Sequence, residues 1–194
     1  MKAERTFVRE HFTPEDNAAD GVFGRVLLMT YESRFGSGAI ITVGGRVKHH
    51  LWGGPLSDIL AAAEERAPRA VRVKMPSDIA GALADYFQGM PVDFTGWLPD
   101  DSGFSDFAAA VYRATRGLKW GETADYSRIA AAIGRPSAVR AVGTALGRNP
   151  MPLFIPCHRV VSRHGEGGWS GPPGLKAKLL AMEARERNGR NLTA

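Results

Sequence analysis

One short stretch constrains the fold of this 194-residue chain more than any other. Residues 149–161 read Asn-Pro-Met-Pro-Leu-Phe-Ile-Pro-Cys-His-Arg-Val-Val, with three prolines among seven residues. Each proline fixes its φ angle, lacks a backbone N–H donor and drives the preceding residue toward extended geometry. The stretch therefore predicts a stiff, extended segment rather than a helix. It presents the single cysteine of the chain, Cys157, directly after a proline.

The N-terminal half shows short apolar runs typical of strands, followed by one amphipathic helix. Residues 22–31 and 39–43 contain β-branched side chains, and Gly44-Gly45 after the second run predicts a tight hairpin. Ser77 is in position to cap a helix with four apolar side chains on one face, which are Ile79, Leu83, Tyr86 and Phe87. We expect a small α/β unit over residues 1–92 and a connector rich in Pro, Gly, Asp and Ser over 93–104.

The C-terminal half, residues 105–194, is predicted to be a helical domain. Ser105 is in position to cap its first helix. Residues 126–133 and 138–146 form two short helices around a turn that contains Gly134, with Ser137 as the cap of the second, and this is a helix-turn-helix pattern. The whole chain is therefore expected to be an α+β protein.

Basic charge is concentrated in the second half of the chain. Residues 1–100 hold 11 Lys and Arg against 13 Asp and Glu, whereas residues 101–194 hold 14 against 7. Between residues 126 and 165 there are six arginines and no acidic residue. Such a block favours a polyanionic partner. A solvated basic face is the alternative interpretation.

Composition excludes several classes of protein. An apolar fraction of 44% and a charged fraction of 23% are those of an ordinary globular chain. No apolar run reaches the ~18 residues that a membrane span needs, and residues 1–10 do not resemble a signal peptide. A single cysteine excludes an internal disulfide and a zinc site with two thiolates. We expect a chain kept in a reducing, intracellular compartment.

The residues after Cys157 indicate a reactive thiol rather than a small buried hydrophobe. His158 and Arg159 carry or can gain positive charge, which favours the nucleophilic thiolate. Neighbouring side chains of an extended segment point to opposite sides, so contact between the imidazole and the thiol requires a turn or a water molecule.

A carboxylate is expected to orient His158, and the last predicted helix offers Glu183. Glu183 borders an apolar stripe made of Leu175, Leu179 and Met182. A charged group at the edge of a buried face needs a partner. The alternative is a surface ion pair between Glu183 and Arg187, one helical turn later.

Gly143 lies inside the second helix of the helix-turn-helix pattern. Glycine there costs about 1 kcal/mol of helix propensity relative to alanine. Either another molecule approaches the backbone closely at this point or a neighbouring helix packs against it.

The motif Pro156-Cys157-His158-Arg159-Val160, preceded by residues 147–150 and by the helix that carries Arg140, resembles the O6-alkylguanine-DNA alkyltransferase (methylated-DNA–protein-cysteine methyltransferase) family. The resemblance covers residues 107–183. It implies a DNA repair protein that acts once, moving the alkyl group of O6-alkylguanine, and also of O4-alkylthymine, from a flipped base to its own cysteine. Cys157 is intact, unlike the cysteine of the non-catalytic alkyltransferase-like proteins.

The resemblance also implies the active-site roles. Cys157 would accept the alkyl group, and His158 with Glu183 would generate the thiolate through a water molecule. Tyr126 would help to neutralise the departing guanine, and Asn149 would join the DNA-binding helices to the active-site segment. Three further residues would contact the guanine or wall its pocket, namely Val160, Trp169 and Ser170.

For DNA binding, the resemblance implies that the second helix enters the minor groove of duplex DNA. Arg140 would fill the gap left by the flipped nucleotide. The small residues Ala138, Ala141 and Gly143 would permit the close approach, and Ser127 and Arg163 would add contacts.

The sequence departs from the family in its glycine-rich loop, residues 165–171. Trp169 within this loop and Pro172-Pro173 directly after it are unusual, and they leave the preferred size of the alkyl group open. Some relatives hold zinc in the N-terminal half, but this half has no cysteine, so we predict no metal and no cofactor. We expect a monomer in the cytoplasm, associated with the nucleoid.

Two other functions compete with repair. A helix-turn-helix binding module or regulator would contain Cys157 only incidentally. A multiple-turnover cysteine hydrolase is disfavoured because no distant histidine is accompanied by a suitable Asn or Asp.

Overall fold

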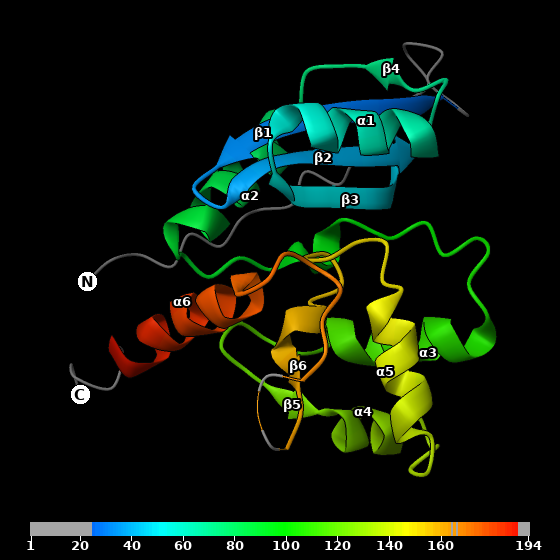
Figure 1. Ribbon diagram of the computed structural model, residues 1–194, viewed down its shortest axis with the longest axis vertical. Coiled ribbons are helices and arrows are strands. Elements are labelled where there is room, and N and C mark those ends of the chain that lie inside the picture. Colours follow the sequence, from blue (N-terminus) through cyan, green and yellow to red (C-terminus); the bar gives the residue numbers. More distant parts are fainter. Residues whose placement is uncertain (1–24, 164, 166, 190–194) are drawn as a thin grey trace.

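The computed structural model describes residues 25–163, 165 and 167–189, the last five of these by their backbone only. The N-terminal unit contains β1 (Val26–Ser33), β2 (Gly36–Val43), β3 (Arg46–Gly54), α1 (Leu56–Arg66), β4 (Val71–Arg72) and α2 (Ser77–Gln88). The connector contains η1 (Phe94–Gly96), and the C-terminal unit contains α3 (Asp106–Arg116), β5 (Ala124–Asp125), α4 (Tyr126–Ala132), α5 (Val139–Gly147), η2 (Cys157–Arg159), β6 (Val160–Val161) and α6 (Leu175–Gly189). Figure 1 shows the sheet with α1 and α2 in its upper half and α3–α6 below.

The N-terminal sheet has the strand order β3-β2-β1-β4. β1, β2 and β3 are antiparallel, and β4 is parallel to β1. Gly44 and Gly45 make the predicted tight hairpin between β2 and β3, with φ angles of 54° and 73°. A two-residue turn with positive φ at both positions suits glycine because it has no Cβ.

The two faces of this sheet bury different side chains because successive residues of a strand point to opposite sides. One face packs Leu28 and Ile41 against Ile59 of α1 in a small separate cluster. The other face packs Met29 and Ile40 against α2, and these side chains belong to the core of the helical unit as well. α2 therefore lies between the sheet and the C-terminal unit, where its side chains can reach both.

The C-terminal unit consists mainly of helices. α4 and α5 form the predicted helix-turn-helix pair, and α3 packs against both. The two-residue strands β5 and β6 pair in parallel and bring the start of α4 next to the segment that follows Cys157. The expected fold class, a small N-terminal α/β unit followed by a helical domain, is confirmed.

Helix caps were predicted with mixed success. Ser105 caps α3 as expected, its hydroxyl accepting from the N–H of Ala108. Ser77 is instead the first residue of α2, and Pro76 with extended φ and ψ precedes it. Ser137 does not cap α5 either, because that helix begins one residue after Ala138. A serine can cap only where its own backbone is still non-helical.

α1 was not predicted, and the first strand begins later than expected. Only Ile59 and Ala63 of α1 are buried, so its apolar face is too narrow to produce a clear helical period. The predicted run over residues 22–31 corresponds to β1 from Val26, and residues 22–24 lie outside the described part.

The two units share backbone hydrogen bonds along the outer edge of β3. The N–H of Val47 donates to the carbonyl of Leu98, at 3.0 Å, and the N–H of His50 donates to the carbonyl of Pro150, at 2.9 Å. The predicted connector, residues 93–104, therefore covers a strand edge that would otherwise be unpaired. The proline-rich segment is held against the sheet in the same way.

Candidate active site

The proline-rich segment ends in a tight turn rather than in extended chain. Residues 149–156 form no helix, as predicted, but residues 157–159 form the 3-10 turn η2. The N–H of Arg159 donates to the carbonyl of Pro156, at 2.9 Å. This turn corrects the expectation of an extended segment through Cys157, and its cause is that residues 157–159 follow the last proline and keep their N–H donors.

The turn separates the side chains of the motif. With three residues per turn, consecutive side chains of a 3-10 helix diverge by about 120°. Arg159 donates to the carbonyl of Leu118, at 2.7 Å, and to Glu183 rather than to the thiol. The guanidinium of Arg159 is thus directed at the carboxylate and a backbone carbonyl, and its influence on the thiolate stays a prediction.

Glu183 on α6 collects most of the buried hydrogen bonds at this site. Its side chain is 1% exposed, so the alternative of a surface pair with Arg187 is wrong. Its Oε1 lies 2.9 Å from Nε2 of His158, and Arg159 donates from Nε to Oε2, at 2.9 Å, and from Nη2 to Oε1, at 3.0 Å. The backbone N–H of Gly121 donates to Oε2, at 3.1 Å. The structure thus brings His158 and Glu183 together.

These contacts define the protonation of the pair. Burial alone raises the pKa of Glu183, but the bonds from His158 and Arg159 bring it to about 2. Burial lowers the pKa of His158 below its ordinary value, although Glu183 opposes this shift. At neutral pH we assign an ionised Glu183 and a neutral His158. Because the carboxylate can only accept, Nε2 carries the imidazole proton and Nδ1 is left as the basic nitrogen.

The thiol of Cys157 is closed off from solvent. The residue is 4% exposed, and the indole N–H of Trp169 donates to Sγ, at 3.3 Å. Burial raises the pKa of this thiol, while hydrogen bonds from Asn149 and Trp169 and the charge of Lys176 oppose the rise. In this closed arrangement Cys157 is a neutral thiol. A base is therefore needed to generate the nucleophile.

Asn149 ties together the turn that leads to Cys157. Its amide Nδ2 donates to the carbonyl of Ile155, at 2.8 Å, and its Oδ1 accepts from the N–H of Met151, at 3.0 Å. Within this turn Leu153 has a φ of 73°, an unusual angle for a branched side chain. Asn149 follows α5, so it links the helix-turn-helix pair to the segment that carries the thiol.

Tyr126 contacts the loop that follows β6, and Trp169 belongs to that loop. Tyr126 is the first residue of α4, and its hydroxyl donates to the carbonyl of Gly168, at 3.0 Å. Trp169 lies over Gly171, where a Cβ atom would come within 2.4 Å of the indole ring. Glycine at 171 is thus required for the indole to lie over the thiol. Ser170, between them, is exposed.

Val160 is the residue of β6 that lies nearest to the cysteine in sequence. Its side chain is fully buried, and its carbonyl accepts from Nζ of the buried Lys176, at 2.7 Å. This bond joins α6 to the backbone just after the 3-10 turn.

The residues expected to bind DNA lie on α4, α5 and the loop after β6. Arg140 and Ala141 are exposed on α5, and Ala138 at its start is half-buried. A Cβ atom on Gly143 would lie 3.8 Å from the ring of Tyr126, an ordinary contact. Packing inside this molecule therefore does not require glycine at 143.

Arg163 and Ser127 are paired with each other in this structure. The guanidinium of Arg163 donates to Oδ2 of Asp125, at 3.2 Å, and to Oγ of Ser127, at 2.7 Å. Asp125 also caps α4 by accepting from the N–H of Arg128, at 2.7 Å. The positive charge of Arg163 is thus partly neutralised at the expected DNA surface.

Sequence reasoning missed two buried residues of this site. Tyr86 on α2 donates to Oε1 of Glu183, at 3.0 Å, although the sequence only placed it on an apolar helical face. Lys176 shares a face of α6 with Glu183, seven residues later, and that spacing could have indicated a polar face turned inward. No sequence signal could have linked Tyr86 with Glu183, because they are 97 positions apart.

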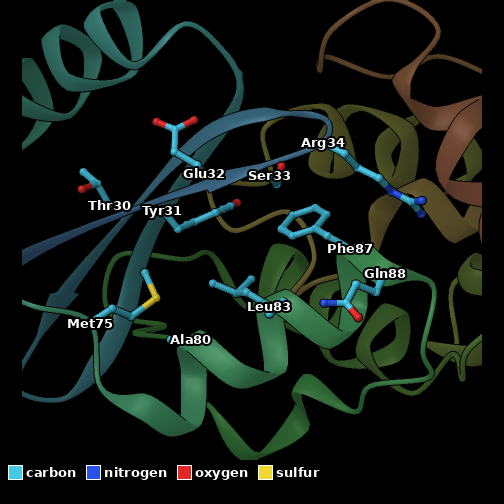
Figure 2. Close-up of a pocket in the computed structure, with 11 residues that line it drawn as sticks. Thr30, Tyr31, Glu32, Ser33, Arg34, Met75, Ala80, Leu83, Phe87 and Gln88 are labelled. Carbon is cyan, nitrogen blue, oxygen red and sulfur yellow. The ribbon is translucent and has the colours of Figure 1, made fainter.

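A separate hollow of about 350 Å³ lies between β1 and α2, away from the cysteine. Figure 2 shows Tyr31 and Phe87 pointing toward each other there, and their ring centroids are 5.6 Å apart. Its other lining side chains include Met75 and Leu83. The hollow holds none of the predicted site residues.

Within residues 25–163, 165 and 167–189, no group of three or more His, Cys, Asp or Glu side chains could hold a metal ion. Among the helices in that same part of the chain, none is long and apolar enough to cross a membrane.

Known proteins resemble this chain in sequence and in fold. The family described as 6-O-methylguanine DNA methyltransferase, DNA binding domain, matches residues 106–185. A methylated-DNA–protein-cysteine methyltransferase of Metallosphaera sedula is 46% identical over 101 residues, which are 52% of this chain and 63% of that protein. The inducible methyltransferase of the same name from Bacillus subtilis is 34% identical over 135 residues, covering 68% and 74% of the two chains.

Solved structures extend the likeness to the N-terminal unit. The crystal structure of Mycobacterium tuberculosis O6-methylguanine methyltransferase is 29% identical, has a TM-score of 0.66, and aligns with 82% of this chain and 93% of its own. A structure of the M. tuberculosis protein in complex with DNA is 30% identical, has the same TM-score and aligns with 82% and 94% of the two chains. This chain belongs to the methylated-DNA–protein-cysteine methyltransferase family.

Proposed function

We propose that this protein repairs alkylated duplex DNA by transferring the alkyl group of O6-alkylguanine to Sγ of its own Cys157. The observation that carries the proposal is the buried His158–Glu183 pair directly after Cys157, on a segment that Asn149 links to the end of the α4–α5 helix-turn-helix. A base stacked inside a duplex cannot reach a thiol in that position, so the damaged nucleotide has to be flipped out. O4-alkylthymine is a second substrate of the same chemistry.

The reaction replaces the bond between the alkyl carbon and O6 of guanine by a bond between that carbon and Sγ of Cys157. Neutral His158 takes the thiol proton of Cys157 through a water molecule, and Glu183 stabilises the imidazolium that results. The sulfur then attacks the alkyl carbon, the C–O6 bond breaks as the S–C bond forms, and the departing guanine takes a proton from the Tyr126 hydroxyl, which the proton held by His158 replaces by way of solvent. The product is a thioether, which water does not cleave. Each molecule therefore acts once.

The closed site must open for this attack. Sγ can meet the alkyl carbon only if the indole of Trp169 moves away from it, because that N–H contacts the sulfur at 3.3 Å. The Tyr126 hydroxyl must likewise break its hydrogen bond to the carbonyl of Gly168 before it can donate to the departing guanine.

DNA binding is proposed for the α4–α5 pair, with α5 in the minor groove and the protein acting as a monomer. Arg140 is exposed on α5, where it can occupy the space of the flipped nucleotide. Ala138, Ala141 and Gly143 present little bulk beside it, and intramolecular packing does not explain Gly143. Ser127 and Arg163 add contacts once their mutual pairing is exchanged for phosphate.

Mass spectrometry tests the proposal. The protein is incubated with duplex DNA containing one O6-methylguanine and digested. We expect Cys157 to gain one methyl group, with at most one equivalent transferred per molecule, and Cys157→Ser to gain none. An unmodified parent protein would refute alkyl transfer. A Cys157→Ser variant with all activity intact would favour a DNA-binding module in which the cysteine is incidental.

A further inference from the structure

The N-terminal unit contributes one polar atom to the buried pair that activates the thiol. Tyr86, on α2, is fully buried, and its hydroxyl donates to Oε1 of Glu183, at 3.0 Å. The hydroxyl oxygen of Tyr86 also lies 3.3 Å from Nε2 of His158. Since the one proton on Nε2 is directed at Oε1, 2.9 Å away, the Tyr86 hydroxyl acts on His158 through the carboxylate oxygen that both side chains contact. One hydroxyl thus contacts both members of the pair.

Geometry holds this hydroxyl in place. The ring of Tyr86 packs edge-on against Trp120, at 5.2 Å between centroids, and tilts against Phe94, at 5.5 Å. Burial and the negative charge of Glu183 raise the pKa of the Tyr86 phenol well above its ordinary value, so it stays a donor throughout the working pH range. α2 packs on the sheet by its other apolar side chains, which ties the position of the hydroxyl to the N-terminal unit.

We propose that Tyr86 is a positioning residue for alkyl transfer, through which the N-terminal unit sets the basicity of His158. This inference rests on the proposed function of Cys157. By donating to Oε1, the hydroxyl withdraws charge from the oxygen that His158 also contacts. A less basic Glu183 stabilises the imidazolium less, so His158 stays neutral, and able to accept the thiol proton, at lower pH.

The other charged groups around His158 do not replace this effect. Arg159 from the 3-10 turn is bound to both oxygens of Glu183, and Lys176 from α6 donates to the carbonyl of Val160. Both cations lower the pKa of His158. Tyr86 adds a separate, neutral donor to Oε1, the oxygen that lies 2.9 Å from Nε2 of His158.

Tyr86→Phe tests the inference because it removes the hydroxyl and keeps the ring. Tyr112→Phe is the matched control: Tyr112 is also buried, and its hydroxyl donates to a backbone carbonyl, that of Ala145, at 2.9 Å. The rate of methyl transfer from duplex DNA is measured between pH 5 and pH 8.5. In Tyr86→Phe the acidic limb should move up by about one pH unit. Transfer would then be about tenfold slower on that limb and close to the parent rate at pH 8.5.

A merely structural role gives a different result. Loss of packing or stability would slow the reaction by a similar factor at every pH, and that outcome, or a profile identical to the parent, would overturn the inference. Tyr112→Phe should keep the parental profile. A profile that moves equally in both variants would also overturn it.

An NMR titration separates this inference from the proposed function. The imidazole signals of His158, assigned with a His158→Gln variant, are followed through the same pH range. We expect the pKa of His158 to rise in Tyr86→Phe and to stay unchanged in Tyr112→Phe. If the parent transfers no methyl group, the proposed function fails, while this titration still decides whether Tyr86 tunes His158. An unchanged pKa in both variants refutes the inference.

Discussion

At the scale of single residues, Glu183 organises the chemistry of the site. It is buried on α6 and accepts from His158, Arg159, Tyr86 and Gly121. A carboxylate with this many donors is stable as an anion even though burial disfavours charge. Glu183 therefore both orients the base and compensates the buried guanidinium of Arg159.

Replacing Glu183 with Gln should affect both stability and rate. The neutral amide leaves Arg159 buried without a counter-charge, so we expect a loss of about 3 kcal/mol in the free energy of unfolding. Transfer to Cys157 should slow by roughly 10- to 100-fold, because the imidazolium loses its partner. Urea titration gives the first quantity and single-turnover kinetics the second. A parental rate in a folded variant would mean that Glu183 is purely structural.

At the scale of elements, the α4–α5 pair exposes Arg140, the side chain proposed to enter DNA, on the face of α5 that is turned away from the core. Val142, Ala145 and Leu146 bury one face of α5, and Arg140 and Ala141 are exposed on the other. The helix period alone makes this division. The helix pair is also linked to the cysteine segment, because Asn149, which follows α5, donates to the carbonyl of Ile155.

The Arg140→Ala variant separates base flipping from alkyl transfer. Flipping costs a few kcal/mol, which an inserted side chain offsets, so the reaction with O6-methylguanine in duplex DNA should slow by about 10- to 100-fold. Reaction with a free O6-alkylguanine base, followed by the same mass analysis, should stay within about twofold of the parent. Arg66→Ala, on α1 in the other unit, controls for loss of one positive charge. Equal losses with both substrates would remove the role of Arg140 in flipping.

At the scale of the whole molecule, the N-terminal sheet holds the cysteine segment through a buried histidine. Nδ1 of His50 on β3 donates to the carbonyl of Pro152, at 2.5 Å, and Nε2 accepts from the hydroxyl of Tyr31, at 2.6 Å. Burial lowers the pKa of His50 to about 4, despite the opposing bond to Pro152. Nε2 can accept from Tyr31 only in the neutral ring with its proton on Nδ1, whereas the bond to Pro152 is also possible in the protonated ring.

This arrangement predicts that acid weakens the fold. Above about pH 6.5 the ring of His50 is neutral in both the folded and the unfolded chain, so its contribution is complete. As pH falls toward 4, the unfolded chain takes up the proton first, and about 3 kcal/mol of stability is lost. His158, whose pKa is also lowered, acts in the same direction.

Urea titrations at several pH values check this prediction. His50→Gln keeps one donor and one acceptor but has no proton to gain, so its stability should fall less steeply between pH 6.5 and 4. The loss that remains below about pH 4.5 belongs to the carboxyl groups whose pKa the fold lowers, among them Glu183 and Asp125, because they are protonated first in the unfolded chain. Identical slopes for the parent and His50→Gln would contradict the assignment.

Features that depend on neighbouring residues could be predicted from the amino-acid sequence. Prolines 150, 152 and 156 excluded a helix before Cys157, Gly44-Gly45 required a hairpin, and the periods of α2, α4 and α5 followed from their apolar spacing. The cysteine motif indicated the family on local residues alone. Such features are set by φ restrictions and by spacing within about ten residues, which a sequence displays directly.

The groups that surround the thiol could not be predicted in this way, because they come together through long-range packing. The 3-10 turn directed Arg159 toward Glu183 and away from Cys157, and Trp169 closed over the sulfur. The fold also brought Tyr86 and His50 of the N-terminal unit into contact with His158 and Pro152, which lie 72 and 102 positions later in the chain. These contacts depend on how two units pack, and burial then sets the pKa of each group. Neither effect has a local signal in the chain.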